Sequence, residues 1–211
     1  MSTIAVEFDP VTHTYRAGLR EFVSVSKVIR TMMPFKKSFD GVPEHIIENA
    51  RERGIRVDAY CCEYARTGDI LTKPDERKDV IDRVQMFADW WDKQETANVL
   101  TQHILSDDAN SIAGTPDLIV TPYKTIIVKL LDIKCTAKEE ADWRYQLGAY
   151  ASMANPLCDV ELAVIHIQKG GLKVRKYDTA DCMARWSRLV AFWNDCKPWL
   201  KPVAADGDGE L

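Results

Sequence analysis

The sequence has no apolar run long enough to cross a bilayer or to act as a secretion signal. We therefore expect a cytoplasmic protein without a membrane partner. The six cysteines show no C-x-x-C spacing and no accompanying histidine cluster, a pattern that favours reduced, mostly buried thiols over a zinc site. Positive charge is not in excess either, since the formal net charge is −4. Binding to a polyanion would therefore need a local basic strip, or metal ions between protein and phosphates.

The rest of the composition is that of a globular protein. With 211 residues, of which 46% are hydrophobic and 28% charged, the chain is long enough to bury a sizeable core. We predict a single domain over residues 1–201, followed by a disordered tail over residues 202–211. Within the domain we expect N-terminal helices and a β-meander (1–98), a core that holds the functional site (99–178) and a C-terminal helix (179–200).

The hydrophobic spacing predicts an α/β fold, with a mixed central sheet flanked by helices and an N-terminal β-meander. We expect strands at residues 4–8, 13–16, 21–25, 99–105, 118–120, 125–134, 160–168 and 172–177. We expect helices from Ser24 or Ser26 to about Met33 and over residues 43–67, 74–96, 137–154 and 179–200. The helix over 74–96 should be capped by Thr72 with Asp75, and the helix over 137–154 by Thr136 with Glu139.

Residues that carry chemistry gather at the end of the strand over residues 125–134. This run is apolar almost throughout, as in a strand buried on both faces, and it ends with Asp132 and Lys134. Side chains alternate along a strand, so these two project from the same face. Asp117 opens another apolar run, and the turn residues 122–124 predict that the two runs pair as a hairpin. Two carboxylates and one ammonium would then lie close together.

Such a group suits divalent-cation chemistry. Mg²⁺ prefers hard oxygen ligands and keeps waters and phosphate oxygens around it. A bound ion can polarise a phosphodiester and lower the pKa of an attacking water. Lys134 would either orient that water or neutralise charge on the phosphorus centre. The alternative is a surface salt bridge at a strand end, because a lone D-x-K arises often by chance.

Two polar residues of the following helix could join this group. Gln146 and Tyr150 are four residues apart and share one helical face. Because the predicted helix cap, Thr136, lies only two residues beyond Lys134, both side chains can lean back toward the aspartates.

Taken together, these residues resemble a known nuclease pattern. Pro116-Asp117, then Asp132-Ile133-Lys134, then Gln146 and Tyr150 is similar to the PD-(D/E)xK nuclease superfamily in its RecB-like, phage-type exonuclease branch. The resemblance implies a restriction-endonuclease-like fold. It also implies a Mg²⁺- or Mn²⁺-dependent deoxyribonuclease, an exonuclease in phage-type recombination, repair or replication. DNA and a single-strand annealing or recombination protein would be its partners, in the cytoplasm of a bacterial host if a phage encodes it.

The resemblance also implies roles for individual residues. The metal ligands would be Asp117, Asp132 and the backbone carbonyl of Ile133, with Lys134 as the catalytic lysine. Gln146 and Tyr150 would contact DNA or organise the site. Thr115 and Arg56 are further candidate substrate contacts. No iron–sulphur cluster is expected, because Cys182 and Cys196 are too few and too far apart for the cysteine trio that cluster-bearing relatives carry.

The sequence departs from this pattern at two places. In that branch an upstream G-x-x-x-H motif often supplies a histidine ligand, whereas here Asp58 stands at the histidine position after Gly54. Aspartate can bind Mg²⁺ or Mn²⁺, so Asp58 is a candidate ligand; alternatively it is a solvated helix residue beside Arg53 and Arg56. Relatives often carry a further glutamate on the strand predicted over residues 99–105, where this chain has Thr101 and Gln102.

Other interpretations remain open from the sequence. The site would equally serve a structure- or sequence-specific endonuclease, or a nuclease-fold module that binds DNA or a protein without cutting. The arginines of the helix over residues 43–67 could neutralise phosphates, or form a solvated face paired with glutamates. Trp90 and Trp91 fit core packing, with a base-stacking platform as the alternative.

Overall fold

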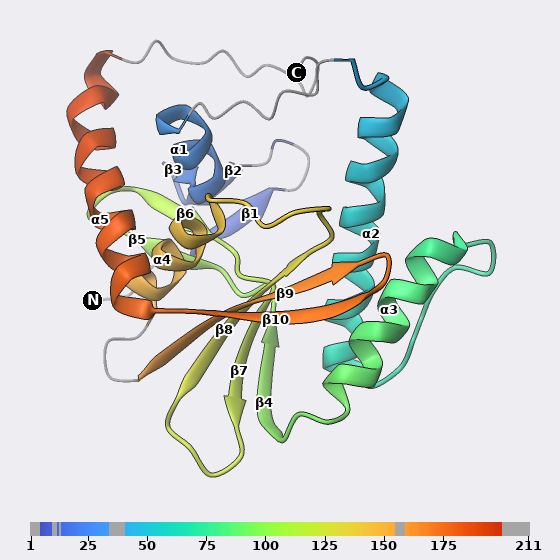
Figure 1. The fold of residues 1–211 in the computed structure, drawn as a ribbon. Coiled ribbons are helices and arrows are strands. Elements are labelled where there is room, and N and C mark those ends of the chain that lie inside the picture. Colours follow the sequence, from blue (N-terminus) through green and yellow to red (C-terminus); the bar gives the residue numbers. More distant parts are fainter. Residues whose placement is uncertain (1–4, 10–11, 13, 34–40, 155–158, 200–211) are drawn as a thin grey trace.

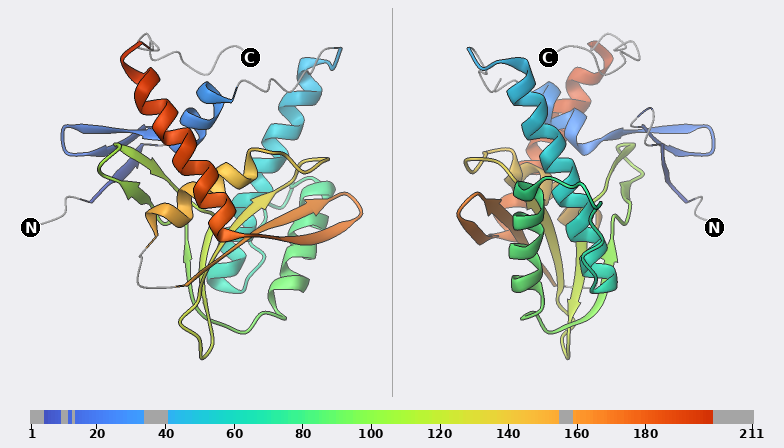
Figure 2. Two further views of the ribbon diagram at one scale, coloured as in Figure 1. Left: turned by 60° about the vertical axis from the view of Figure 1, so that its left-hand side comes forward. Right: turned by 90° about the vertical axis from the view of Figure 1, so that its right-hand side faces the viewer.

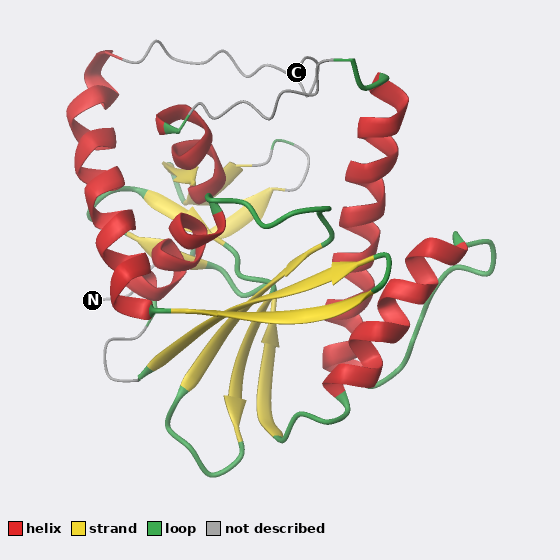
Figure 3. Cartoon of the chain, viewed as in Figure 1, coloured by secondary structure: helices red, strands yellow, loops and turns green. Residues whose placement is uncertain are grey.

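The computed structural model describes residues 5–9, 12, 14–33, 41–154 and 159–199. Over these ranges the chain forms five α-helices and ten strands, and the strands make two five-stranded sheets (Figures 1 and 3). The predicted mixed α/β fold with flanking helices and an N-terminal β-meander is therefore confirmed. The predicted tail over residues 202–211 lies outside the described residues. Within the described ranges, no helix has the length and apolar character needed to cross a membrane.

One sheet has shorter strands, contains the N-terminal meander and is called the smaller sheet below. Its strands lie in the order β1 (Glu7–Asp9), β2 (Thr14–Ala17), β3 (Arg20–Ser24), β6 (Ile112–Gly114) and β5 (Leu105–Asp107). The first three strands project from the rest of the molecule in both views of Figure 2. After them, α1 (Val25–Met32) begins as predicted, since the Ser24 hydroxyl accepts a hydrogen bond from the Lys27 amide at 3.1 Å.

The larger sheet positions the candidate site. Its order is β10 (Gly171–Tyr177), β9 (Val160–Gln168), β8 (Val128–Lys134), β7 (Leu118–Pro122) and β4 (Thr96–Thr101). Strands β8 and β9 are parallel and the other neighbours antiparallel. The two predicted hairpins, β7–β8 and β9–β10, are therefore confirmed.

Helices cover both faces of this sheet (Figure 1). One face is covered by α2 (Glu44–Thr67) and α3 (Lys78–Trp91), the other by α4 (Trp143–Met153) and α5 (Thr179–Cys196). Strand β8 contributes to both resulting cores: Leu130 packs with α4 and α5, whereas Leu131 and Ile133 pack with α2 and α3. This alternation confirms that β8 is buried on both faces.

Two predicted helix starts are wrong, because residues near the expected starts make other hydrogen bonds. Helix α4 begins at Trp143, not near 137. The Thr136 hydroxyl donates to the Lys138 carbonyl at 2.7 Å instead of capping a helix. The Glu139 carboxylate accepts from Tyr177 at 2.8 Å and pairs with Arg175 at 2.9 Å.

Helix α3 likewise begins at Lys78, with Arg77 as the N-cap, rather than at 74 after a Thr72–Asp75 cap. The side chain of Glu76, which is 1% exposed, accepts hydrogen bonds from the Arg77 amide at 2.9 Å and the Tyr60 hydroxyl at 2.8 Å. These contacts hold the preceding segment against α2.

Two other boundaries also differ. The strand expected over residues 99–105 divides at Gln102, whose φ of 50° ends β4 before β5 begins in the other sheet. Helix α5 stops at Cys196, and the 3-10 turn Lys197–Trp199 follows it.

Candidate active site

The β7–β8 hairpin brings the first two predicted residues together. Its register places Leu118 opposite Leu131, so Asp117 and Asp132 come at neighbouring positions where the pairing ends. The Asp117 carboxylate accepts a hydrogen bond from the backbone amide of Ile133 at 2.6 Å. One aspartate therefore contacts the backbone directly beside the other.

Lys134 completes this group. Its Nζ lies 2.5 Å from Oδ2 of Asp132, as expected for two side chains on the same face of β8. The Asp132 side chain is only 2% exposed and that of Lys134 is 24% exposed, which excludes a surface salt bridge. Apart from this ion pair, neither carboxylate oxygen of Asp132 has a hydrogen-bond partner among the described residues. Buried carboxylate oxygens are normally hydrogen-bonded, so Asp132 is open to a further ligand.

Asp58 adds a third carboxyl group from α2. Burial, and secondly the charge of Asp132, raise the pKa of Asp58 to about 6, although Lys134 opposes the shift. Burial and the charges of Asp58 and Asp132 also raise the pKa of Asp117 well above its usual value. Burial alone would lower the pKa of Lys134, but the charges of Asp132 and Asp117 outweigh it and raise that pKa. The four groups therefore form one electrostatic cluster.

The arginines near Asp58 in sequence pair with other residues. Arg53 lies 3.6 Å from Asp79, and Arg56 lies 3.3 Å from Glu52 and 3.2 Å from Glu76. Asp58 itself is half-buried, and the charges that shift its pKa are those of Asp132 and Lys134 rather than those of these arginines. Arg56, a candidate substrate contact, already has two carboxylate partners.

Cys62 is a site residue that the sequence reasoning missed. Its buried thiol lies 3.5 Å from Oδ1 of Asp58 and 3.6 Å from the backbone carbonyl of Asp117. The spacing of four residues from Asp58 on a helix was the available signal, because it places both on one face. Cys62 therefore links α2 to the start of β7.

Gln146 and Tyr150 reach the cluster from α4. The Gln146 amide donates a hydrogen bond to the Tyr150 hydroxyl at 2.8 Å, and Tyr150 is 3% exposed. Burial, and secondly the charge of Asp132, raise the pKa of Tyr150 well above its usual value. The phenol therefore keeps its proton, and its oxygen accepts the hydrogen bond from Gln146. Thr115 shares a hydrogen bond of 2.9 Å with the hydroxyl of Tyr15 on β2.

Gly114 leaves the space in which the Tyr150 ring lies. A Cβ atom at this position would sit 2.9 Å from Cε1 of Tyr150 and 2.8 Å from Cγ2 of Val25. We expect Gly114→Ala to lower the free energy of unfolding by about 1–3 kcal/mol, because the tyrosine or α1 must shift. Chemical denaturation measures this change. Gly170→Ala is the matched control, since an added Cβ there meets nothing within 4 Å; equal stability of the two variants would contradict the prediction.

The side chains of the cluster are of the type that binds a hard cation through oxygen ligands. Asp117 and Asp132 provide carboxylate oxygens, and a site of one or two carboxylates completed by water and phosphate oxygens is what Mg²⁺ favours. Across the described ranges, however, no three or more His, Cys, Asp or Glu side chains are arranged as a ready-made metal site. Asp58 is therefore near the pair without completing a three-ligand group.

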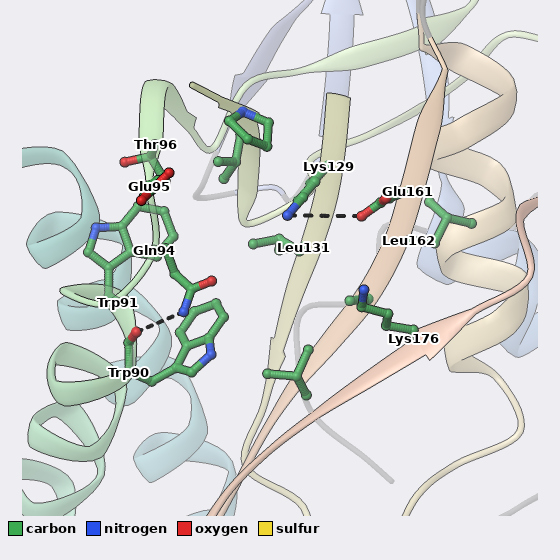
Figure 4. Close-up of a pocket in the computed structure, with 14 residues that line it drawn as sticks. Trp90, Trp91, Gln94, Glu95, Thr96, Lys129, Leu131, Glu161, Leu162 and Lys176 are labelled. Atoms are coloured by element: carbon green, nitrogen blue, oxygen red, sulfur yellow. Dashed lines mark hydrogen bonds and ion pairs between the residues drawn. The ribbon is translucent and has the colours of Figure 1, made fainter. Parts of the chain in front are cut away.

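A separate cavity of about 260 Å³ lies between α3 and the sheet (Figure 4). It is lined by Trp90 and Trp91 from α3 and by Lys129 at the other end of β8, which pairs with Glu161 at 3.9 Å. Trp91 is 8% exposed and stacks on Phe87 at 5.6 Å, as core packing predicts. None of the candidate catalytic residues lines this cavity.

The sequence matches no family model and no curated protein. Among solved structures, the alkaline exonuclease LHK-Exo from Laribacter hongkongensis is 14% identical, with a TM-score of 0.42 over 87% of this chain and 93% of that chain. The protein SSO0001 is 12% identical, with a TM-score of 0.39 over 86% of this chain and 77% of that chain. Both similarities concern the arrangement of helices and strands alone.

Proposed function

We propose that this protein is a metal-dependent deoxyribonuclease that hydrolyses DNA phosphodiester bonds at the cluster of Asp117, Asp132 and Lys134. The observation that carries the proposal is the environment of Asp132. This carboxylate is buried, has Lys134 as its only close partner among the described residues, and lies beside Asp117.

The energetics of this cluster favour a functional origin. Placing carboxylates together in a buried site costs stability, and one ammonium offsets only part of their repulsion. Such arrangements are typical of sites where the charges act on a ligand. A purely structural role would be served better by apolar side chains of similar volume.

The cluster divides into residues that would hold a cation and residues that would hold the substrate. Asp117, Asp132 and the Ile133 carbonyl would hold Mg²⁺ or Mn²⁺, with Asp58 as a further ligand. When bound, such an ion supplies Lewis-acid charge and an activated water.

Two other side chains would act on the phosphate directly. Lys134, oriented by Asp132, would neutralise charge that develops on the phosphate or position the attacking water. The Tyr150 hydroxyl, held by Gln146, would donate a hydrogen bond from the α4 side.

The exonuclease assignment and the role in phage-type recombination, repair or replication rest on the sequence resemblance. In the same way, Thr115 and Arg56 stay proposed substrate contacts, and a single-strand annealing or recombination protein stays a proposed partner.

We expect end-labelled single- or double-stranded DNA to be degraded with Mg²⁺ or Mn²⁺ and to stay intact with chelator. Absence of degradation under every condition would refute the proposal. An endonuclease would also cut circular single-stranded DNA, which an exonuclease should leave intact.

A module that binds DNA or a protein without cutting is the second candidate. It is favoured by one observation, namely that the described residues provide no three-ligand group of acidic, histidine or cysteine side chains. Calorimetric titration with Mg²⁺ and Mn²⁺ separates the two candidates. Metal binding at millimolar concentrations that Asp132→Asn weakens supports the nuclease, and no binding favours the non-cleaving module.

A further inference from the structure

Three arginines converge on a single carboxylate where α2 meets α3. Arg77 donates two hydrogen bonds to Asp79, at 3.0 and 3.1 Å. Arg53 and Arg83 approach the same carboxylate only to 3.6 and 3.7 Å, beyond hydrogen-bond distance. The recorded ion pairs of all three arginines lead to Asp79. We call Arg53, Arg77 and Arg83 the arginine cluster.

The arginine cluster is short of both negative charge and hydrogen-bond acceptors. Three guanidinium groups face one carboxylate, and the nearby Glu76 is used by Arg56 and Tyr60. The Arg83 guanidinium donates one hydrogen bond, from Nη1 to the backbone carbonyl of Asp79, but the Nε groups of Arg53 and Arg83 are buried and have no hydrogen-bond partner within the described part of the chain. The Arg83 side chain is 9% exposed and that of Arg53 is 23% exposed. Leaving charged donors buried and unpaired is costly, so a missing acceptor is the simplest explanation.

We propose that the arginine cluster binds a tetrahedral oxyanion of the phosphate class. Guanidinium groups match phosphate through paired N–H···O bonds, and their charge does not titrate near neutral pH. The cluster also surrounds the start of α3, whose N-cap Arg77 makes no side-chain capping bond. The positive end of the helix dipole therefore adds to the attraction for an anion.

The arginine cluster lies on the face of the sheet that α2 and α3 cover, and α2 also carries Asp58 of the candidate active site. Cys135 directly follows Lys134, and its side chain packs against the core under α2 and α3. Burial raises the pKa of Cys135 to about 11, and the charges of Arg83 and Arg53 partly oppose this. Arg53 and Asp58 are five residues apart on α2, a rise of about 7.5 Å along the helix.

Two kinds of molecule could supply this phosphate group. It is either free inorganic phosphate or a phosphate of the DNA strand, away from the bond that is cut. The second source rests on the proposed nuclease function, whereas oxyanion binding itself does not. We propose the DNA strand, because Arg53 of the cluster and Asp58 of the active site lie five residues apart on the same helix.

Calorimetric titration with inorganic phosphate in chelator tests the site itself. Chelator keeps the aspartates free of metal, and sodium chloride holds the ionic strength constant. We expect Arg53→Met and Arg83→Met to weaken phosphate binding by roughly tenfold or more. Lys78→Met is the matched control, because it removes one charge from α3 at a residue that pairs with Asp82. No binding by the unmodified protein, or equal binding by Arg53→Met and Lys78→Met, would overturn the proposal.

Two further variants guard against a purely structural explanation. Arg83→Lys keeps the positive charge but loses the planar guanidinium group, so it should also weaken phosphate binding. It replaces Arg83→Met in the test if that variant does not fold. Asp79→Asn removes the internal competitor, so it should bind phosphate more tightly than the unmodified protein. A cluster that only ties α2 to α3 would instead show weaker or absent binding in Asp79→Asn, which would refute the site.

Kinetics on a short single-stranded oligonucleotide identify the source of the phosphate. If the DNA strand supplies it, Arg53→Met should raise KM at least several-fold more than Lys78→Met and change kcat little. An unchanged KM with weakened phosphate binding would overturn the strand as the source and assign the site to free phosphate. Phosphate binding without any nuclease activity would refute the proposed function and still support the oxyanion site.

Discussion

Asp132→Asn is expected to abolish DNA cleavage, by about 10³-fold or more in kcat, while the protein stays folded. The substitution keeps the shape of the side chain but removes the charge that would bind a cation and that holds Lys134 at 2.5 Å. Cleavage of end-labelled DNA by the purified variant, at saturating Mg²⁺ or Mn²⁺, measures the effect. Activity within a few-fold of the unmodified protein would refute the assignment of the site.

Stability should respond to the same substitution in a different way. Asp132 shares its site with the carboxyl groups of Asp58 and Asp117, whose pKa values it helps to raise. Removing one of these charges relieves repulsion, so we expect the free energy of unfolding without metal to be unchanged or higher. Asp82→Asn, at an exposed residue of α3, is the matched control and should alter neither quantity. Loss of both fold and activity in Asp132→Asn would indicate a structural role.

Gly148→Ala is expected to cost about 3 kcal/mol of stability or more. The added Cβ would lie 2.1 Å from the carbonyl oxygen of Cys182 and 3.1 Å from Cβ of Trp186. Because one of these atoms belongs to the α5 backbone, no rotamer change can relieve the clash, and α4 and α5 must separate. The free energy of unfolding in urea measures the loss.

A second glycine provides the control for this prediction. Gly54 also lies inside a helix, α2, but a Cβ there meets nothing within 4 Å. Gly54→Ala should therefore stabilise the protein by about 0.5–1 kcal/mol, the ordinary gain when alanine replaces glycine in a helix. Changes of the same sign in both variants would mean that the close approach of α4 and α5 does not decide stability.

The elements that follow from local pattern were predictable from the sequence. The apolar run of β8 determines which of its side chains share a face, and the turn before it predicts pairing with β7. The close approach of Asp117, Asp132 and Lys134 could therefore be predicted. The start of α4 could not. Thr136 and Glu139 have the spacing of a capping box, but Glu139 bonds instead to Tyr177, 38 residues away. Such distant partners leave no trace in a local pattern.

The residues missed at the candidate sites share this cause. Cys62 belongs to the active site only because the end of α2 meets the start of β7. Arg83 is one of several charged residues in a helical pattern, and its burial depends on how α2 packs against α3. The catalytic, metal-binding and substrate-binding roles, like the single domain, stay predictions.

The path of the chain between the two sheets has a consequence for the candidate site. Strand β6 leaves the smaller sheet at Gly114, and Asp117 follows three residues later, a connection that spans about 10 Å when extended. The Tyr15–Thr115 hydrogen bond ties this connection to β2. The three projecting strands are therefore separated from the Asp117 carboxylate by a short connection that carries a hydrogen bond to β2.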